Sequence, residues 1–391
     1  MLRSSLGFHT LTLKKWLLCN EKERLIEDVR KYNLSHPIES IQVYKDKKNP
    51  ENTIIKFPKY QGIKWVIRSD MLHAQLKSTL DLIEVTINPK FLSGIQDYIT
   101  AATYDDMDAA VATFDRISTN ISPVLGTFAD YDLKRIDYCI NFSVSELAPD
   151  CTSDQIMNLI RRGDIPPSYK EYKQYDKISH RTRASPNSFY LVNKSVTINC
   201  YRKGTEIQKR MANGIMREDP DFITETLDEA EDIIRFEVQC KYHNVYARSR
   251  RAKANGNKEV NLCEDLLSDE TCADIINYYF NKIIGRGLWY SLYAARAQIR
   301  SCHFNSQKEK RLIEALELVN RCQSLADSKE LLQGKELEAF KRTLKDLSSI
   351  GINPVTIPKG WGIGRIWNLL DAYYSKVSEE RINKQWDEEL F

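Results

Sequence analysis

The stretch SVTINCYRKGTEIQKRM, Ser195–Met211, begins with the alternation of a β-strand and ends with the composition of a helix. A strand turns successive side chains to opposite faces, so the apolar residues fall on one face. The other face carries Thr197, Asn199 and Tyr201. Lys203 follows Tyr201 at a spacing of two, so a continuing strand would project both side chains to the same side. This pattern predicts a sheet with one apolar and one polar face.

Two other stretches repeat this pattern, RIDYCINF at 135–142 and IIRFEVQCKY at 233–242. Each predicts a strand with an apolar face, and each places one acidic residue on the polar face, Asp137 in the first and Glu237 in the second. Solvated sheet faces are commonly polar, so either acid alone is weak evidence for a site. Their occurrence together with Tyr201 favours a shared site on the polar face.

The first two thirds of the chain alternate strand and helix signals. Short β-branched runs bounded by polar, Gly or Pro residues predict strands at TIIKFP, IKWVIRS, DLIEVTIN and SFYLVN, and FHTLTLKKW predicts a first strand in preference to a transit peptide. Helices are predicted over 105–121 and 152–162, with an acidic helix within 218–232. We therefore expect an α+β fold: a largely antiparallel sheet with helices on one face.

The pattern changes after about residue 260. Apolar stripes at helical spacing predict helices over 268–284, 308–326 and 335–350, and a last helix that includes Ile366, Trp367, Leu370 and Tyr374. The polar and basic run Arg248–Glu259, RSRRAKANGNKE, is expected to link the two parts. The predicted organisation is an α+β domain over 1–260 and a helical C-terminal region over 261–391.

Composition narrows the class of protein. The chain has 391 residues, 42% of them apolar, and a formal net charge of only +3. The segment 161–220 nevertheless contains 13 Lys and Arg against 6 Asp and Glu, which indicates a polyanionic partner. No run approaches the roughly 20 apolar residues of a membrane helix, so no membrane association is expected. Nine cysteines without a CxxC pair are typical of reduced thiols in a cytoplasmic protein.

The polar-face residues suggest phosphodiester chemistry. Two carboxylates on nearby strands, Asp137 and Glu237, could hold Mg²⁺ or Mn²⁺, and such a cation polarises a phosphodiester. A tyrosine hydroxyl, with a pKa of about 10, attacks phosphorus only when activated. Neighbouring cations or a metal would favour the phenolate of Tyr201, and Lys203 would bind the non-bridging phosphate oxygens. These residues form the predicted catalytic pair, Tyr201 and Lys203, and the predicted metal ligands.

The order R-I-D at 135–137, Y-x-K at 201–203 and R-F-E at 235–237 resembles rolling-circle replication initiators. The similarity is to the Rep_trans group of plasmid and mobile-element initiators and, more distantly, to filamentous-phage gene II replication proteins, and it covers about 133–246. It implies that Tyr201 is the nicking nucleophile, which stays joined to the 5′ end as a phosphotyrosine, and that Asp137 and Glu237 form the metal site. The Gly-Ser turn often seen before the tyrosine strand is replaced here by Leu191–Lys194.

The resemblance also implies the partners. We expect double-stranded origin DNA, extruded as a hairpin, single-stranded DNA, and a host helicase and polymerase; the oligomeric state, including a homodimer, stays open. Candidates for contacts to the DNA backbone are Arg181, Arg183, Arg202, Arg248, Arg250 and Arg251.

Other functions remain possible on the same residues. A non-catalytic initiator could bind and melt an origin through its basic segments, and a relaxase of a mobilisable element would share the nicking chemistry. None of the six histidines forms the pair around one apolar residue found in other nicking enzymes. The motif H-R-T-R at 180–183 spells a recombinase signature, but it lies among predicted strands and is interpreted as a loop that either contacts phosphate or is solvated.

Overall fold

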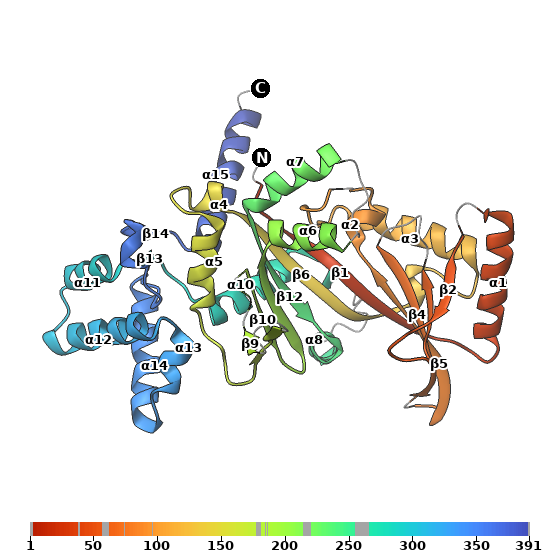
Figure 1. Ribbon diagram of the computed structural model, residues 1–391, viewed down its shortest axis with the longest axis horizontal. Helices are drawn as coiled ribbons and strands as arrows, with labels where there is room; N and C mark the ends of the chain where they lie inside the picture. Colours follow the sequence, from red (N-terminus) through yellow and green to blue (C-terminus); the bar gives the residue numbers. More distant parts are fainter. Residues whose placement is uncertain are drawn as a thin grey trace.

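The computed structural model describes residues 3–37, 40–56, 62–73, 75–95, 97–176, 181–183, 185, 187–213, 220–254 and 266–389. A large sheet, whose strands differ in length, runs through the molecule (Figure 1). Helices surround this sheet and extend beyond one end of it. The fold is α+β, as the alternation of strand and helix signals predicts, with a helical C-terminal region.

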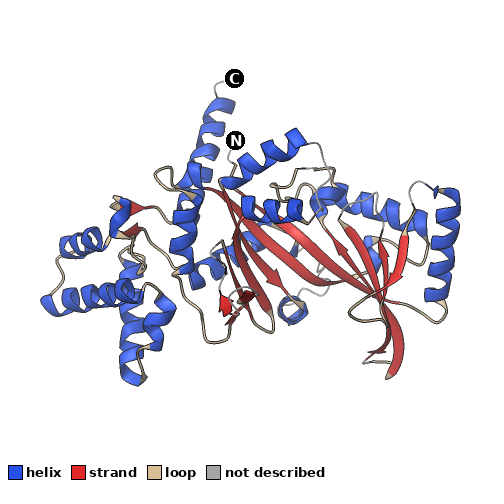
Figure 2. Ribbon diagram, viewed as in Figure 1, coloured by secondary structure: helices blue, strands red, loops and turns tan. Residues whose placement is uncertain are grey.

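The central element is a sheet of ten described strands in the order β2-β3-β4-β5-β1-β6-β12-β11-β10-β7, drawn in red in Figure 2. Every neighbouring pair in it is antiparallel. Its strands are β1 Ser5–Trp16, β2 Gln42–Lys45, β3 Thr53–Lys56, β4 Ile63–His73, β5 Ser78–Ile87, β6 Asp132–Ser143, β7 Lys170–Glu171, β10 Ser188–Val192, β11 Val196–Arg202 and β12 Ile233–Cys240. A separate pair joins β8 Gln174–Asp176 to β9 Arg181–Arg183.

Helices cover the apolar face of this sheet. They are α1 Glu21–Ser35, α3 Met107–Ile121, α5 Ser153–Arg161, α8 Tyr242–Ala254 and α10 Asp269–Ile283. The ring of Phe280 packs edge-on against Phe142 and Phe236, with ring centroids 5.5 and 5.3 Å apart, and Phe114 of α3 packs against Trp65. Alternation along the strands turns these aromatic residues to one side, so one continuous core forms beneath the sheet.

The opposite face is partly covered as well. The short helix α2 Pro89–Leu92 leads into a segment whose Ile99 carbonyl accepts hydrogen bonds from Asn141 and Arg235 on the sheet. Helices α6 Lys203–Ala212 and α7 Pro220–Glu231 lie beside it and share a small apolar cluster of Tyr98, Ile207 and Ala230. The polar face of the central strands is therefore a covered, polar layer at one end of the sheet.

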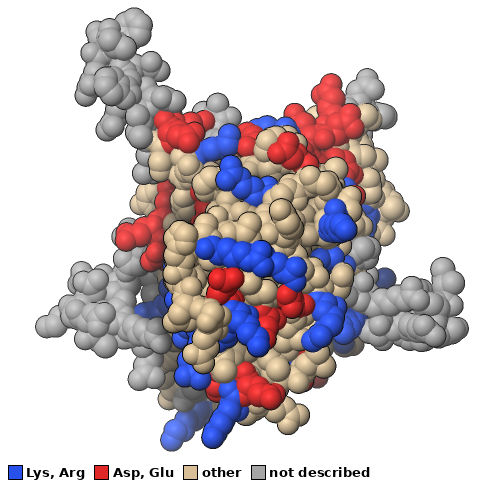
Figure 3. Space-filling model, turned by 90° about the vertical axis from the view of Figure 1, so that its left-hand side faces the viewer, with Lys and Arg blue, Asp and Glu red and all other residues tan. Residues whose placement is uncertain are grey.

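Four C-terminal helices build a second core: α11 Leu292–Ser301, α12 Ser306–Cys322, α13 Leu325–Glu330 and α14 Gly334–Ser349. The last helix, α15 Leu369–Glu389, and the strand pair β13 Trp289–Tyr290 and β14 Arg365–Ile366 pack on the main core instead. A cluster around Leu312, Leu316 and Phe340 holds α11 to α14 together. The end of the molecule that carries these helices exposes Lys and Arg interspersed with Asp and Glu, not a patch of one sign (Figure 3). No helix in the described ranges is long and apolar enough to cross a membrane.

The predicted strands and the helices over 105–121, 152–162 and 268–284 are confirmed within a few residues. The loop expected at H-R-T-R is wrong, because Arg181–Arg183 form strand β9, and so is the expected start of the last helix. The basic run that starts at Arg248 continues helix α8 as far as Ala254, because alanines and long basic side chains favour helix. The last helix begins at Leu369, since Ile366 belongs to strand β14. The division at residue 260 stays a prediction, although α10 packs on the sheet and shares its core.

Candidate active site

Tyr201 and Glu237 meet on the polar face of the sheet, as their strand patterns predict. Tyr201 is the penultimate residue of β11 and pairs with Arg235 of β12, so Glu237 lies two residues further along the neighbouring strand. The Tyr201 hydroxyl donates a 2.7 Å hydrogen bond to Glu237 Oε1. The tyrosine is 9% exposed and the glutamate 2%. The carboxylate is thus placed to hold, and to accept, the phenol proton.

His9 joins this pair and was missed by the sequence analysis. A register shift between Phe8 and Thr10 marks a bulge in β1, and His9 lies in it. Its Nδ1 lies 3.5 Å from Glu237 Oε1. Burial lowers the pKa of His9 to about 4, so the imidazole is neutral at neutral pH and the contact is not an ion pair. The alternation of FHTLTLKKW signals the strand, but nothing in it signals the bulge.

Lys203 lies near Tyr201 but not as the continuing strand would place it. It begins helix α6, its Nζ lies 5.9 Å from the centroid of the Tyr201 ring, and it donates a 2.7 Å hydrogen bond to Glu206. Burial, with the nearby Arg235 charge, lowers the pKa of Lys203 to about 8. Its charge is therefore already matched by a carboxylate, and the side chain is buried rather than solvated.

The electrostatics around Tyr201 do not favour a phenolate. Burial raises the pKa of Tyr201 well above 10, and the negative charge of Glu237 raises it further, against the opposing effect of Arg235. Burial raises the pKa of Glu237, but His9, Arg235 and the Tyr201 hydroxyl lower it by more, so the net direction is down. The expectation that neighbouring cations ionise the phenol is wrong. The arrangement is a neutral phenol bonded to an ionised carboxylate.

Asp137 occupies the same face in β6 and is fully buried. Register places it opposite Gln239, two residues from Glu237 on the adjacent strand. Arg135 holds both carboxylate oxygens, with Nε 2.7 Å from Oδ1. Burial raises the pKa of Asp137 to about 6, and the charge of Glu237 adds to this rise while Arg135 opposes it. Both carboxylates are buried and not solvated.

The metal site stays a prediction. No group of three or more His, Cys, Asp or Glu side chains within the described ranges could hold a metal ion. Mg²⁺, however, is usually bound by one or two carboxylates together with substrate phosphates, not by a complete protein cage. Asp137 and Glu237 fit that donor set, provided that Arg135 releases Asp137.

Arg202, at the end of β11, lines the same cavity as Tyr201 and Glu237. Its guanidinium contacts Ser153 Oγ at 3.1 Å and forms 2.6 Å ion pairs with Asp154 and Glu231. These partners tie α5 and α7 to the end of β11. The contact of Arg202 with DNA stays a prediction.

The other predicted DNA-contacting arginines lie elsewhere. Arg181 and Arg183 belong to strand β9, and Arg250 and Arg251 to helix α8, but the side chains of these four lie outside the described part. Arg248 is described, and its Nε donates a 3.0 Å hydrogen bond to Asn244 one turn earlier in α8.

Two cavities open on the polar face. The first, of about 290 Å³, is lined by the Tyr201 and Glu237 side chains together with His9, Glu206 and the exposed Lys209. The second, of about 350 Å³, lies beside it, and Ser188 and Asn199 line both. The tyrosine hydroxyl thus borders a space large enough for a phosphate group.

Comparisons with known proteins give little guidance. No protein-family model matches the chain, and no curated protein matches it. One solved structure, that of a rolling circle replication initiator protein from Geobacillus stearothermophilus, is similar at 11% identity over 72% of this chain and 85% of that chain, with a TM-score of 0.32. That similarity is too low to assign the chain to a family.

Proposed function

We propose that this chain is a replication initiator that nicks one strand of DNA at a specific origin, with Tyr201 as nucleophile. The observation that carries the proposal is the 2.7 Å hydrogen bond between the Tyr201 hydroxyl and a buried, ionised Glu237 at the wall of a cavity. A hydroxyl group that is protonated at neutral pH is a weak nucleophile, and an adjacent general base activates it by accepting its proton. Tyr201 and Glu237 have the geometry of such a pair.

The proposed step is a transesterification. The Tyr201 oxygen forms a bond to phosphorus while its proton passes to Glu237, and the bond from phosphorus to the 3′ oxygen breaks. The leaving 3′ oxygen takes up a proton from solvent, and the 5′ phosphate remains joined to the tyrosine. Because the phosphodiester is exchanged and not hydrolysed, the reverse reaction can rejoin the strand. The free 3′ hydroxyl would prime synthesis by a host polymerase.

A raised phenol pKa is compatible with this step. Glu237 makes the free phenolate unfavourable, but it also provides the acceptor to which the proton moves as the new bond forms. His9 contacts the same Glu237 oxygen and would orient the carboxylate as a neutral partner. It therefore belongs to the proposed site as a positioning residue.

The phosphate needs a cation, and Lys209 is the better candidate than Lys203. Lys209 is exposed and lines the cavity, whereas the ammonium of Lys203 is bonded to Glu206. A flexible exposed ammonium can follow a phosphate oxygen at low cost. Lys203 would contribute a buried positive charge beside the Tyr201 ring.

We further propose Mg²⁺ or Mn²⁺ as a cofactor that joins the site together with DNA. Asp137 and Glu237 would hold it, and when bound it would neutralise charge that develops on the phosphate. Arg135 would then be released from Asp137 and become free to contact the DNA backbone. Binding of the cation to the free protein should accordingly be weak.

Helix α8 is the proposed DNA-binding element. Its sequence YHNVYARSRRAKA contains three arginines and a lysine but no acid. At its start the rings of Tyr242 and Tyr246 stack with centroids 5.7 Å apart, and Lys14 of β1 lies 4.7 Å above the first ring. Basic side chains beside exposed aromatic rings suit a single-stranded or distorted DNA backbone.

The test is incubation of the protein with a supercoiled plasmid, with and without Mg²⁺ or Mn²⁺. The plasmid carries the replication origin of the plasmid or mobile element that encodes the protein. Denaturing electrophoresis should show a nicked strand joined to protein. DNA binding without any covalent product would favour the alternative of a non-catalytic origin-binding initiator. A relaxase would give the same adduct, and only the DNA that is transferred in a cell separates the two.

A further inference from the structure

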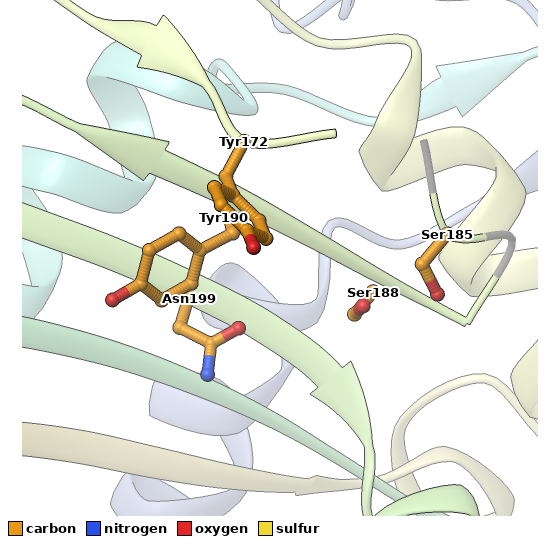
Figure 4. Close-up of a pocket in the computed structure, with 5 residues that line it drawn as sticks. All are labelled: Tyr172, Ser185, Ser188, Tyr190 and Asn199. Atoms are coloured by element: carbon orange, nitrogen blue, oxygen red, sulfur yellow. The ribbon is translucent and has the colours of Figure 1, made fainter. Parts of the chain in front are cut away.

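The second cavity on the polar face has a distinct chemistry. Its volume of about 350 Å³ lies within the range of small-ligand sites. Figure 4 shows the rings of Tyr172 and Tyr190 side by side at one end, with the Asn199 amide beside Tyr190, and the hydroxyls of Ser185 and Ser188 at the other end. All five lining residues are neutral, so the cavity suits an uncharged planar group better than a phosphate.

The aromatic end of the cavity is open to a ligand. Tyr172 follows β7 and is 62% exposed, and its backbone N–H donates a 2.7 Å hydrogen bond to the Tyr190 carbonyl. The two rings meet edge to face, with centroids 5.9 Å apart. This contact orients a ring that is largely exposed. A preoriented exposed aromatic ring is a stacking surface for a nucleobase.

The cavity is adjacent to the proposed nucleophile. Ser188 pairs directly with Tyr201, and Tyr190 pairs with Asn199 on the same face. Tyr190 and Tyr201 are therefore diagonal neighbours, which places their β-carbons about 7–8 Å apart. Stacked nucleotides in one strand rise about 3.4 Å each, so a strand whose phosphate meets Tyr201 would bring a base one or two nucleotides away to Tyr172.

We propose that this cavity binds one unpaired base of single-stranded DNA next to the phosphate that Tyr201 attacks. The base would stack on Tyr172, while the Asn199 amide and the Ser188 hydroxyl would bond to its edge. Base edges and both ring faces are accessible only when the base is unpaired, so the site requires a single strand. The inference rests on the proposed function for the identity of the strand, but its binding test does not require nicking.

The test compares two probes of equal charge: an oligothymidylate of about 15 nucleotides and an oligomer of the same length that lacks bases. Fluorescence anisotropy should show that the wild type binds the oligothymidylate about tenfold more tightly. Tyr172→Ala should reduce this preference severalfold, and any remainder would come from the rings on α8. Tyr172→Phe keeps the ring and should retain the preference. Tyr293→Ala removes an 84% exposed ring on α11 and serves as the matched control.

Equal binding of the two probes by the wild type would overturn the proposal, and so would a full preference in Tyr172→Ala. Because Tyr172 is largely exposed, its substitution leaves the fold intact, which a thermal melt checks. A protein that prefers the oligothymidylate but forms no covalent adduct would refute the proposed function and support the base site. An adduct without any base preference would do the reverse.

Discussion

Replacement of Glu237 by Gln removes the charge of the proposed base and keeps its shape. Glutamine can still accept a hydrogen bond from the Tyr201 hydroxyl, but it cannot take the proton. General-base catalysis contributes typically about 10²–10⁴-fold, so the rate of adduct formation should fall by about that factor. The structure places no other described carboxylate in hydrogen-bond contact with that hydroxyl.

The same substitution should destabilise the protein. Glu237 is 2% exposed and lies 4.0 Å from the Arg235 guanidinium, which is also buried. Loss of one member of a buried pair typically costs about 3–5 kcal/mol. Arg235 keeps its hydrogen bonds to Asn141 and the Ile99 carbonyl, so we expect the lower end of this range, about 3 kcal/mol.

The assay is single-turnover formation of the covalent adduct, measured below the denaturation midpoint of the variant. Urea denaturation gives the change in the free energy of unfolding. Glu206→Gln is the matched control, because that carboxylate lines the same cavity but bonds to Lys203 and not to Tyr201. An adduct rate in Glu237→Gln within about threefold of wild type would show that Glu237 is not the base.

Three further outcomes are expected. Charge reversal of Arg248, Arg250 and Arg251 together should reduce the salt slope of oligonucleotide binding by about 2, and an unchanged slope would remove α8 from the interface. Asp137→Asn should weaken Mn²⁺ binding in the presence of oligothymidylate by about tenfold or more in calorimetry, and an unchanged affinity would exclude it as a ligand. Burial lowers the pKa of Lys90 from 10.5 to about 7 in the folded protein. Between pH 7 and pH 10.5 the Lys90 amine is therefore protonated in the unfolded protein and largely neutral in the folded protein. Wild-type stability relative to Lys90→Met should therefore rise by about 3 kcal/mol from pH 7 to pH 10, and a flat difference would contradict the shift.

Strand alternation predicted most of the fold because the sheet buries one face completely. The apolar residues of β6, β11 and β12 all reach the same core, so period-2 patterns in RIDYCINF and IIRFEVQCKY identified the strands and their polar faces. Elements with weak patterns were missed. Helix α1 and the short β7 lack a strong apolar stripe, and the helical state of α8 was hidden by its basic composition.

The site was predicted in part. Alternation put Tyr201, Glu237 and Asp137 on one face, and register brings the first two into contact. Burial could not be predicted, because the segment at Ile99 that covers this face comes from between other strands and bonds to it through its backbone. Lys203 and His9 depend on a strand-to-helix junction and on a bulge, and both are local backbone events that side-chain periodicity does not record.

The most direct test of the central claim is the mapping of the covalent adduct in Tyr201→Phe. Phenylalanine keeps the ring but removes the hydroxyl that bonds to Glu237. The variant should bind oligonucleotide and yield no protein joined to a 5′ phosphate, while Tyr190→Phe, its neighbour in the sheet, should retain the adduct. A 5′-linked adduct in Tyr201→Phe, located by mass spectrometry on another residue, would contradict the assignment of Tyr201 as the nucleophile.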